Sequence, residues 1–150
     1  MSEWKKRLMT ETLKLLGSFE KTVVKPAPIV VSAQCNRVHV NDGHTECLSV
    51  KLGRKVTVDQ LTGALDRFNP LKGLDLPMSP AKPIVLKTEI DRPQPKLDRD
   101  FDKGMAISVG RIRPCPVLDY KFVVMGHNTI RGAAGAAILN AELMKVKGYI

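Results

Sequence analysis

Two apolar runs near the end of the chain, separated only by a proline-containing turn, most constrain what this sequence can fold into. Residues 105–112 and 117–125 are rich in valine, isoleucine and methionine, and Pro114 and Pro116 lie between them. Runs of this composition are typical of β-strands. Strands joined by so short a connection pair antiparallel, because a parallel partner needs a long crossover. The sequence therefore predicts an antiparallel strand pair here.

Periodicity elsewhere predicts helices at both ends and in the middle of the chain, with strands between them. Helices are expected where apolar residues recur at helical spacing, and strands where β-branched or alternating runs occur. We expect helices at residues 2–17, 57–68 and 128–144, and further strands at residues 29–40, 45–52 and 84–88. The predicted fold class is α+β, with a mostly antiparallel sheet and helices on one face.

Turn and cap signals refine these boundaries. Asn41-Asp42-Gly43 predicts a tight hairpin between the strands at 29–40 and 45–52, because Asp-Gly supplies the positive φ angles that such turns need. Thr57 is predicted to cap the helix that follows it. Residues 91–100 (Asp91-Arg-Pro-Gln-Pro-Lys-Leu-Asp-Arg-Asp100) are polar and stiffened by two prolines, so we expect an exposed arm or loop.

The formal net charge of +9 favours anionic partners such as nucleic acid or phosphorylated metabolites. The basic residues are scattered, however, with one cluster at Lys5-Lys6-Arg7, and no aromatic residues interleave with them as single-strand binding requires. We therefore expect no nucleic-acid partner. No apolar run approaches membrane-spanning length, so we expect no membrane partner. The three cysteines match no disulfide framework, and free thiols favour a cytoplasmic location.

Polar and titratable side chains concentrate between residues 32 and 47, inside the two predicted strands. Arg37 suits a carboxylate, because its guanidinium makes two parallel hydrogen bonds, and His44 suits proton transfer near neutral pH. The turn at residues 41–43 would bring the two side chains together at one end of a hairpin. The residues alone also allow, and by themselves favour, an ion-paired surface arginine and a histidine beside a turn.

The same segment has a metal interpretation and a nucleophile interpretation. Cys35, His39, His44 and Cys47 are possible zinc ligands, but their C-x3-H-x4-H-x2-C spacing is none of the common structural patterns, and we expect no metal. Cys35 lies two residues from Arg37, which makes it conceivable as a nucleophile. Free cysteines in strands are more often small core residues, and we favour that role.

The last predicted helix begins with small residues, from Gly132 to Ala137. Small side chains let another backbone or a flat ligand approach, and a helix N-terminus offers free N–H groups to an anion. A tightly packed helix explains the same residues, and the pattern does not separate the two. No G-x-G-x-x-G loop of the dinucleotide-binding kind occurs in the sequence.

Four segments, taken together, resemble the aspartate-semialdehyde dehydrogenases of archaea and fungi. They follow the family order over nearly the whole chain and comprise Ser32-Ala-Gln-Cys-Asn-Arg-Val38 with Asp42-Gly-His-Thr-Glu46, then residues 91–100, then Ser108-Val-Gly-Arg-Ile-Arg113, and finally Gly126-His-Asn-Thr-Ile-Arg-Gly-Ala-Ala-Gly135. The resemblance implies the C-terminal catalytic and dimerisation part of such an enzyme. It also implies a fold like the C-terminal domain of the glyceraldehyde-3-phosphate dehydrogenase type.

The family reduces aspartyl phosphate to aspartate semialdehyde with NADPH, releasing phosphate, in lysine, threonine and methionine biosynthesis. By resemblance, Arg37 binds the substrate α-carboxylate, His44 is the general acid/base that serves a nucleophilic cysteine, and Asn128 lies near the nicotinamide of NADP. Residues 1–126 would then form the catalytic and dimerisation domain. Residues 127–150 would form a helix that packs on a cofactor domain.

The family's dinucleotide loop, nucleophilic cysteine and helper glutamine have no counterpart in this sequence. We therefore expect the isolated chain to be inactive, to bind no cofactor tightly and to form homo-oligomers. The family's acidic and lysine contacts to the substrate amino group and phosphate do not align cleanly with Glu3, Lys5, Lys6 or Arg7. Two alternatives remain open: a truncated, non-catalytic dimerisation module, and the related malonyl-CoA reductase, which has no use for an amino-group site.

Overall fold

The computed structural model describes residues 3–150, with side chains from residue 7 onward, and the chain divides into two compact units, Met1–His39 and Val40–Ile150. In the first unit, helix α1 (Glu3–Leu15) is followed by a hairpin of two short antiparallel strands, β1 (Ser18–Glu20) and β2 (Val23–Lys25). The helix predicted at this end of the chain is confirmed.

Gly17 explains how the helix and the hairpin of the first unit approach each other. A Cβ at this position would collide with the backbone oxygen of Lys25, so only glycine allows so close a contact. Beyond the hairpin, the N–H of Ala27 donates a hydrogen bond of 2.8 Å to the carbonyl oxygen of Leu13. This bond ties the end of the hairpin back to α1.

The strand predicted at residues 29–40 is wrong. These residues have no regular secondary structure, and Val30 and Val38 are 100% and 73% exposed. β-branched residues favour a strand only where a neighbouring strand offers pairing and burial, and this segment belongs to neither described sheet. Cys35, expected as a small core residue, is exposed for the same reason.

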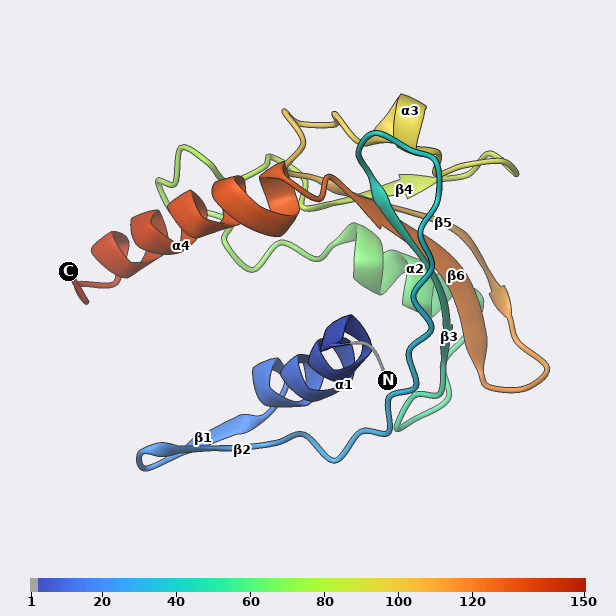
Figure 1. Cartoon of the computed structure of the whole chain (residues 1–150), viewed down its shortest axis with the longest axis horizontal. Coiled ribbons are helices and arrows are strands. Elements are labelled where there is room, and N and C mark those ends of the chain that lie inside the picture. Colours follow the sequence, from blue (N-terminus) through green and yellow to red (C-terminus); the bar gives the residue numbers. More distant parts are fainter. Residues whose placement is uncertain (1–2) are drawn as a thin grey trace. The chain divides into compact units, whose positions relative to one another are not determined.

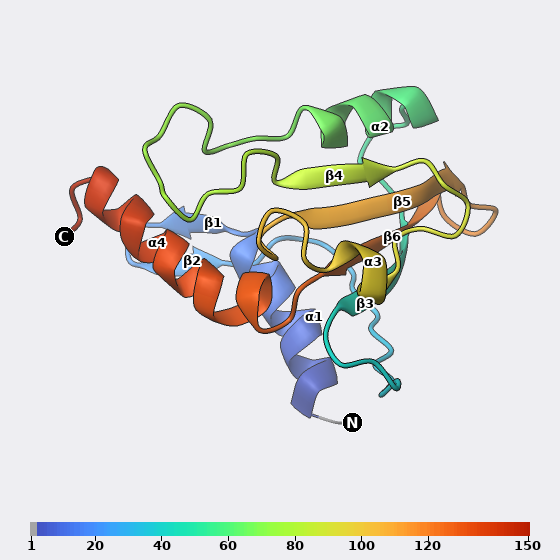
Figure 2. The same cartoon turned by 90° about the horizontal axis from the view of Figure 1, so that it is seen from above.

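The second unit is built on a mixed four-stranded sheet with the order β3-β6-β5-β4. Its strands are β3 (His44–Val50), β4 (Ile84–Lys87), β5 (Ile107–Pro114) and β6 (Tyr120–Gly126). The predicted β5–β6 pair is confirmed as antiparallel, β3 also pairs antiparallel with β6, and β4 runs parallel to β5. Figure 2 shows β4, β5 and β6 side by side. The α+β class is therefore confirmed.

The hairpin predicted at Asn41-Asp42-Gly43 is wrong, because no strand precedes it. Gly43 does adopt the left-handed region, with φ of +111°. The chain that leaves this turn as β3 pairs with β6, a strand some eighty residues later, as its register of His44 with Gly126 shows. The turn conformation depends on residues 41–43 alone, whereas the strand that pairs with β3 lies far away in the sequence.

Helix α2 (Val58–Asp66) is capped as predicted by Thr57. The Thr57 hydroxyl accepts a hydrogen bond of 3.1 Å from the N–H of Gln60, and the Gln60 side chain accepts one of 2.8 Å from the N–H of Thr57. This reciprocal pair satisfies two N–H groups that the first turn of any helix leaves free. The helix then lies against β4 and β5.

The predicted C-terminal helix is confirmed, but it begins with one π-helical stretch, η1 (Ile130–Ala134), before α4 (Gly135–Val146). The proline-rich loop between α2 and β4 packs apolar side chains against α4, while several of its other residues are exposed. Leu76 of this loop, Met105 and Leu139 of α4 form a buried core cluster. This packing holds α4, the C-terminal helix in Figure 1, to the rest of the second unit.

The exposed arm predicted at residues 91–100 is also wrong. The segment contains a short helix, α3 (Pro95–Asp98), which lies against β6, and the Asp98 side chain is fully buried. Among residues 3–150, no helix is both long and apolar enough to cross a membrane. Cys35, Cys47 and Cys115 are free thiols, as expected.

Candidate functional site

A pocket of about 170 Å³ opens where β3 begins and β6 ends. The antiparallel register places the first residue of β3, His44, opposite the last residue of β6, Gly126. The segments on either side of this rung therefore meet, although they are far apart in sequence. The pocket is lined by His44, Glu46, Ile107, Val124, Gly126, His127, Asn128, Arg131 and Gly132.

Two of the three predicted site residues thus line one pocket, His44 and Asn128. Arg37 is exposed, lies outside regular secondary structure and belongs to the first compact unit, whereas His44 belongs to the second. The convergence of Arg37 with His44 therefore stays a prediction. Arg7 lies on α1, and the side chains of Glu3, Lys5 and Lys6 fall outside the described part of the chain.

Asn128 also contacts the turn that precedes His44. Its side-chain oxygen Oδ1 accepts a hydrogen bond of 2.8 Å from the N–H of Gly43. Gly43 is buried, and a Cβ built on it would lie 2.8 Å from the Cβ of Pro95 in α3. The turn is therefore enclosed by the start of the C-terminal helix on one side and by α3 on another.

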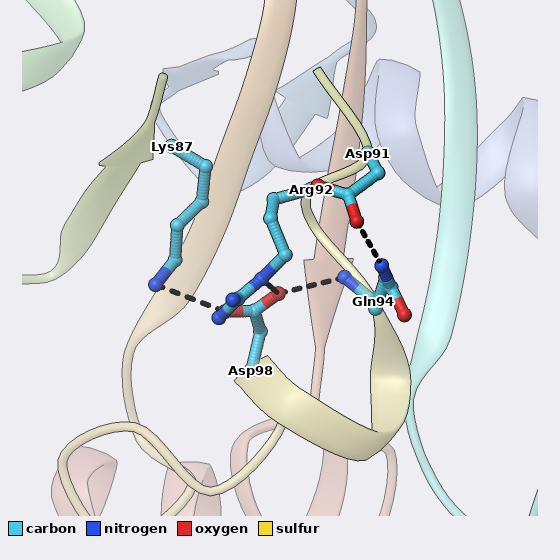
Figure 3. Close-up of polar contacts among 5 residues, drawn as sticks. All are labelled: Lys87, Asp91, Arg92, Gln94 and Asp98. Carbon is cyan, nitrogen blue, oxygen red and sulfur yellow. Dashed lines mark hydrogen bonds and ion pairs between the residues drawn. The ribbon is translucent and has the colours of Figure 1, made fainter. Parts of the chain in front are cut away.

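Figure 3 shows what holds α3 in place. Asp98 accepts hydrogen bonds from Nε of Arg92 at 2.7 Å, from Nη2 of the same guanidinium, and from the N–H of Gln94 at 2.7 Å. Nζ of Lys87, on β4, lies 2.9 Å from the same carboxylate. Burial by itself raises the pKa of Asp98, but the bonds from Arg92, Gln94 and Lys87 outweigh it and hold this pKa well below its ordinary value.

This charged cluster explains why the polar residues 91–100 were wrongly predicted to form an exposed arm. A buried carboxylate is stable only when its charge and its lone pairs are satisfied. Arg92 and Lys87 supply the charge, and Lys87 also lies over the ring of Phe101, with Nζ 3.7 Å from the ring centroid. Asp98 is thus a structural anchor that fixes α3 next to β4, and α3 in turn packs against Gly43.

His127 is a pocket residue that the sequence reasoning missed. It is only 7% exposed, and its Nδ1 lies 3.2 Å from the Thr129 hydroxyl and 3.4 Å from the N–H of Ile130. Its Nε2 lies 3.8 Å from a carboxylate oxygen of Asp100. These contacts place His127 just before η1, where its Nδ1 faces the N–H of the first η1 residue, Ile130. His127 is buried whereas His44 is exposed, and no sequence pattern around His127 indicated that it would be buried.

Glu46 and Arg131 also line the pocket and were not singled out beforehand. For Glu46 a signal existed, because residues two apart on a strand share one face and Glu46 follows His44 by two. Gly132 and Gly135, which the sequence could not distinguish, have different environments. Gly132 lines the pocket, whereas a Cβ on Gly135 would collide with the sulfur of Met105. The tight-packing interpretation therefore holds at Gly135.

A larger and more open depression of about 370 Å³ lies around Thr88, Glu89 and the irregular part of β5. Arg111, in the left-handed region with φ of +58°, and Arg113 contribute to its lining. Neither His44 nor Asn128 takes part in it. The smaller pocket at the start of β3 is therefore the candidate functional site.

Comparison of the sequence with known proteins shows the family to which this chain belongs. Residues 3–131 match the family described as semialdehyde dehydrogenase, dimerisation domain. The chain is 55% identical over 134 residues to the aspartate-semialdehyde dehydrogenase of Archaeoglobus fulgidus, covering 89% of this chain and 38% of that protein. It is 45% identical over 152 residues to the Candida albicans enzyme of the same name, covering 96% of this chain and 42% of that protein.

A solved structure agrees with the sequence matches. The crystal structure of aspartate semialdehyde dehydrogenase with NADP from Candida albicans superposes with a TM-score of 0.90 and 42% identity, covering 100% of this chain and 44% of that one. The chain spans about two fifths of the length of the curated relatives described above. The alternatives left open by the sequence are not favoured by these matches. The chain belongs to the semialdehyde dehydrogenase family and corresponds to the C-terminal, dimerisation-domain part of the aspartate-semialdehyde dehydrogenases.

Proposed function

We propose that this chain supplies the acid/base histidine, a substrate-binding arginine and a cofactor-facing asparagine to an NADP-dependent aspartate-semialdehyde dehydrogenase. Its substrate would be aspartyl phosphate, and its products aspartate semialdehyde and phosphate. The observation that carries the proposal is the pocket that brings His44 and Asn128 together from distant parts of the sequence. Arg131 and Glu46, in the same lining, give the pocket both signs of charge.

His44 is the proposed proton carrier. Its imidazole is exposed at the edge of the sheet, and imidazole exchanges protons near neutral pH. In the proposed reaction a cysteine outside this chain attacks the acyl carbon, and its S–H proton passes to a ring nitrogen of His44. The new thioester carbon–sulfur bond forms as the bond to phosphate breaks. When the aldehyde is released, His44 returns the proton to the sulfur.

NADPH, when bound, would supply the hydride that reduces the thioester. The pocket fits one end of this cofactor and not the whole molecule, because about 170 Å³ lies below the roughly 300–1,000 Å³ of ordinary small-molecule sites. Oδ1 of Asn128 is engaged by Gly43, so its amide N–H groups are the part available to a carboxamide. The dinucleotide's remaining parts would bind outside these 150 residues.

Arg37 is the proposed clamp for the substrate α-carboxylate. Its exposed position outside a strand leaves the guanidinium accessible, and the planar fork matches a carboxylate with two hydrogen bonds. A point charge does not reproduce that fork. In the complete enzyme, Arg37→Lys should therefore raise KM for aspartyl phosphate more than it lowers kcat; an unchanged KM would contradict the clamp.

The acid/base role is tested with His44→Asn in the complete enzyme that contains this chain. Loss of a general acid/base lowers kcat by about 10²–10⁴-fold. The deficit should shrink as the pH rises toward about 8.5, the ordinary thiol pKa, because the nucleophile then ionises without help. Steady-state kinetics from pH 6 to pH 9 measure both effects.

His39→Asn is the matched control, because His39 is exposed and lies outside the pocket. It should leave kcat unchanged. Wild-type kcat in His44→Asn would overturn the acid/base role of His44. NADPH-dependent turnover by the purified 150-residue chain would overturn the proposal that the nucleophilic cysteine lies outside this chain.

A further inference from the structure

We propose that Asn128 is a positioning residue for His44, acting through the Asn128 Oδ1–Gly43 N–H hydrogen bond that closes the end of the β3–β6 ladder. This inference rests on the proposed role of His44 and adds a second role to Asn128 beside its proposed contact with the cofactor. The first observation is the bond itself, 2.8 Å long and joining residues 85 positions apart in sequence.

The bond lies next to the last rung of the sheet. His44 pairs with Gly126, and no further strand pairing occurs beyond that rung between β3 and β6. Gly43 directly precedes His44, and Asn128 follows Gly126 by two residues. The asparagine side chain thus takes the place of a backbone acceptor for a buried N–H, a group that is costly to leave without a partner.

Gly43 has little freedom on its other side. A Cβ there would lie 2.8 Å from Cβ and 3.2 Å from Cα of Pro95, and 3.5 Å from the sulfur of Met125. Pro95 begins α3, which the buried cluster around Asp98 anchors. Gly43 is therefore held between Asn128, which binds its N–H, and Pro95 of α3, which leaves no room for a side chain there.

His44 depends on this support because its own side chain is not held. Within the described residues, the imidazole makes no hydrogen bond or ion pair of its own, and His44 is exposed. Its placement therefore follows from its backbone. A displacement of about 1 Å at a reacting group costs roughly a hundredfold in rate, so a loosened turn should lower kcat.

Substitutions that keep or remove the oxygen of the Asn128 amide distinguish a positioning role from a cofactor contact, because the oxygen binds Gly43 and the NH2 group is the proposed cofactor contact. Asn128→Asp keeps an oxygen that accepts from Gly43 but replaces the NH2 group, whereas Asn128→Ala removes both. If Asn128 positions His44, kcat falls further in Asn128→Ala than in Asn128→Asp. If Asn128 only contacts the cofactor, both substitutions raise KM for NADPH and leave the turn intact.

The experiment measures amide hydrogen exchange of Gly43 by NMR in the 150-residue chain, together with kcat and KM in the complete enzyme. We expect exchange at Gly43 to accelerate about tenfold or more in Asn128→Ala, which corresponds to about 1.4 kcal/mol. Asn128→Asp should retain the protection, and its kcat should be higher than that of Asn128→Ala. Asn140→Ala, at an exposed asparagine of α4, is the matched control and should change neither.

Gly43→Ala provides an independent test if the Asn128→Ala chain folds poorly. The nearest atoms that the added Cβ would meet belong to Pro95 and Met125, so kcat should fall while KM for NADPH stays constant. Unchanged Gly43 exchange in Asn128→Ala, or wild-type kcat in Gly43→Ala, would overturn the inference. Failure of the His44 role itself would appear separately, as wild-type kcat in His44→Asn with Gly43 still protected by Asn128.

Discussion

At the scale of single residues, the charge of Asp98 is balanced inside the fold by two cations and a backbone N–H. The guanidinium of Arg92 and the ammonium of Lys87 both contact a carboxylate that has no exposed side-chain surface. Such a cluster contributes little net stability compared with apolar packing, but removing one partner leaves buried charge uncompensated. Its function here is geometric, because it fixes α3 and through it Gly43.

Asp98→Asn should lower the free energy of unfolding by about 3 kcal/mol at pH 7, because Arg92 and Lys87 lose their buried counter-charge. The folded pKa of Asp98 lies below its unfolded value, so its stabilisation is complete above about pH 4 and is lost as the pH falls below that value. The gap between wild type and Asp98→Asn should shrink by up to about 1.4 kcal/mol per pH unit below pH 4. Urea unfolding at pH 7, 4 and 3 measures this.

Asp66→Asn is the control for this effect. Asp66 pairs with Lys82 at 2.6 Å, but both side chains are about half exposed, at 47% and 52%. An exposed pair of this kind contributes about 1 kcal/mol or less. A loss in Asp98→Asn no larger than in Asp66→Asn would show that the cluster does not anchor α3.

At the scale of elements, two helical glycines show that packing can outweigh the higher helix propensity of alanine. Gly63 lies within α2, and the three atoms nearest to a Cβ there all belong to the flexible guanidinium end of Arg67. Gly135 begins α4, and a Cβ there would meet the sulfur of Met105 and the carbonyl oxygen of Ile130. By helix propensity alone, alanine is better than glycine at both positions.

Gly63→Ala should therefore raise the free energy of unfolding by about 0.5–1 kcal/mol, because alanine has the higher helix propensity and Arg67 can move aside. Gly135→Ala should lower it by about 1–3 kcal/mol, because an overpacked core site must shift its neighbours. Urea denaturation of the two variants beside the parent chain measures both values. Changes of the same sign would contradict the packing explanation.

Strand formation at this scale depended on partners. The runs that became β5 and β6 are adjacent in sequence, and their short connection was enough to predict their pairing. The run at residues 29–40 has a similar β-branched composition but no partner in the described sheets, and it remains irregular. Composition indicates which residues tolerate a strand, whereas cross-strand neighbours decide whether one forms.

At the scale of the whole molecule, the second unit leaves an edge strand and apolar side chains exposed. β3 is at one edge of the sheet, and most of its residues are exposed. Ile90 and Val117 are 89% and 84% exposed. Soluble proteins usually protect such edges and apolar surfaces, and the matching family is described as a dimerisation domain. We propose that the chain forms homo-oligomers.

The 150-residue chain should therefore sediment as a dimer or larger species whose fraction rises with concentration. Association through apolar surface should persist when the salt concentration is raised, whereas association driven by the net charge of +9 should weaken. Sedimentation velocity at low and high salt separates these cases. A monomer at every concentration would contradict homo-oligomer formation by this chain.

The sequence by itself determined the features that depend on near neighbours. The capping box at Thr57, the positive φ at Gly43, the β5–β6 pair and the family motif around His44 all arise within a few residues, where propensity and turn chemistry act. Only the tertiary structure decided that β3 pairs with β6, that Asp98 is buried and that Asn128 binds Gly43. Each of these joins segments whose contact depends on the packing of everything between them, and a local pattern carries no information about that packing.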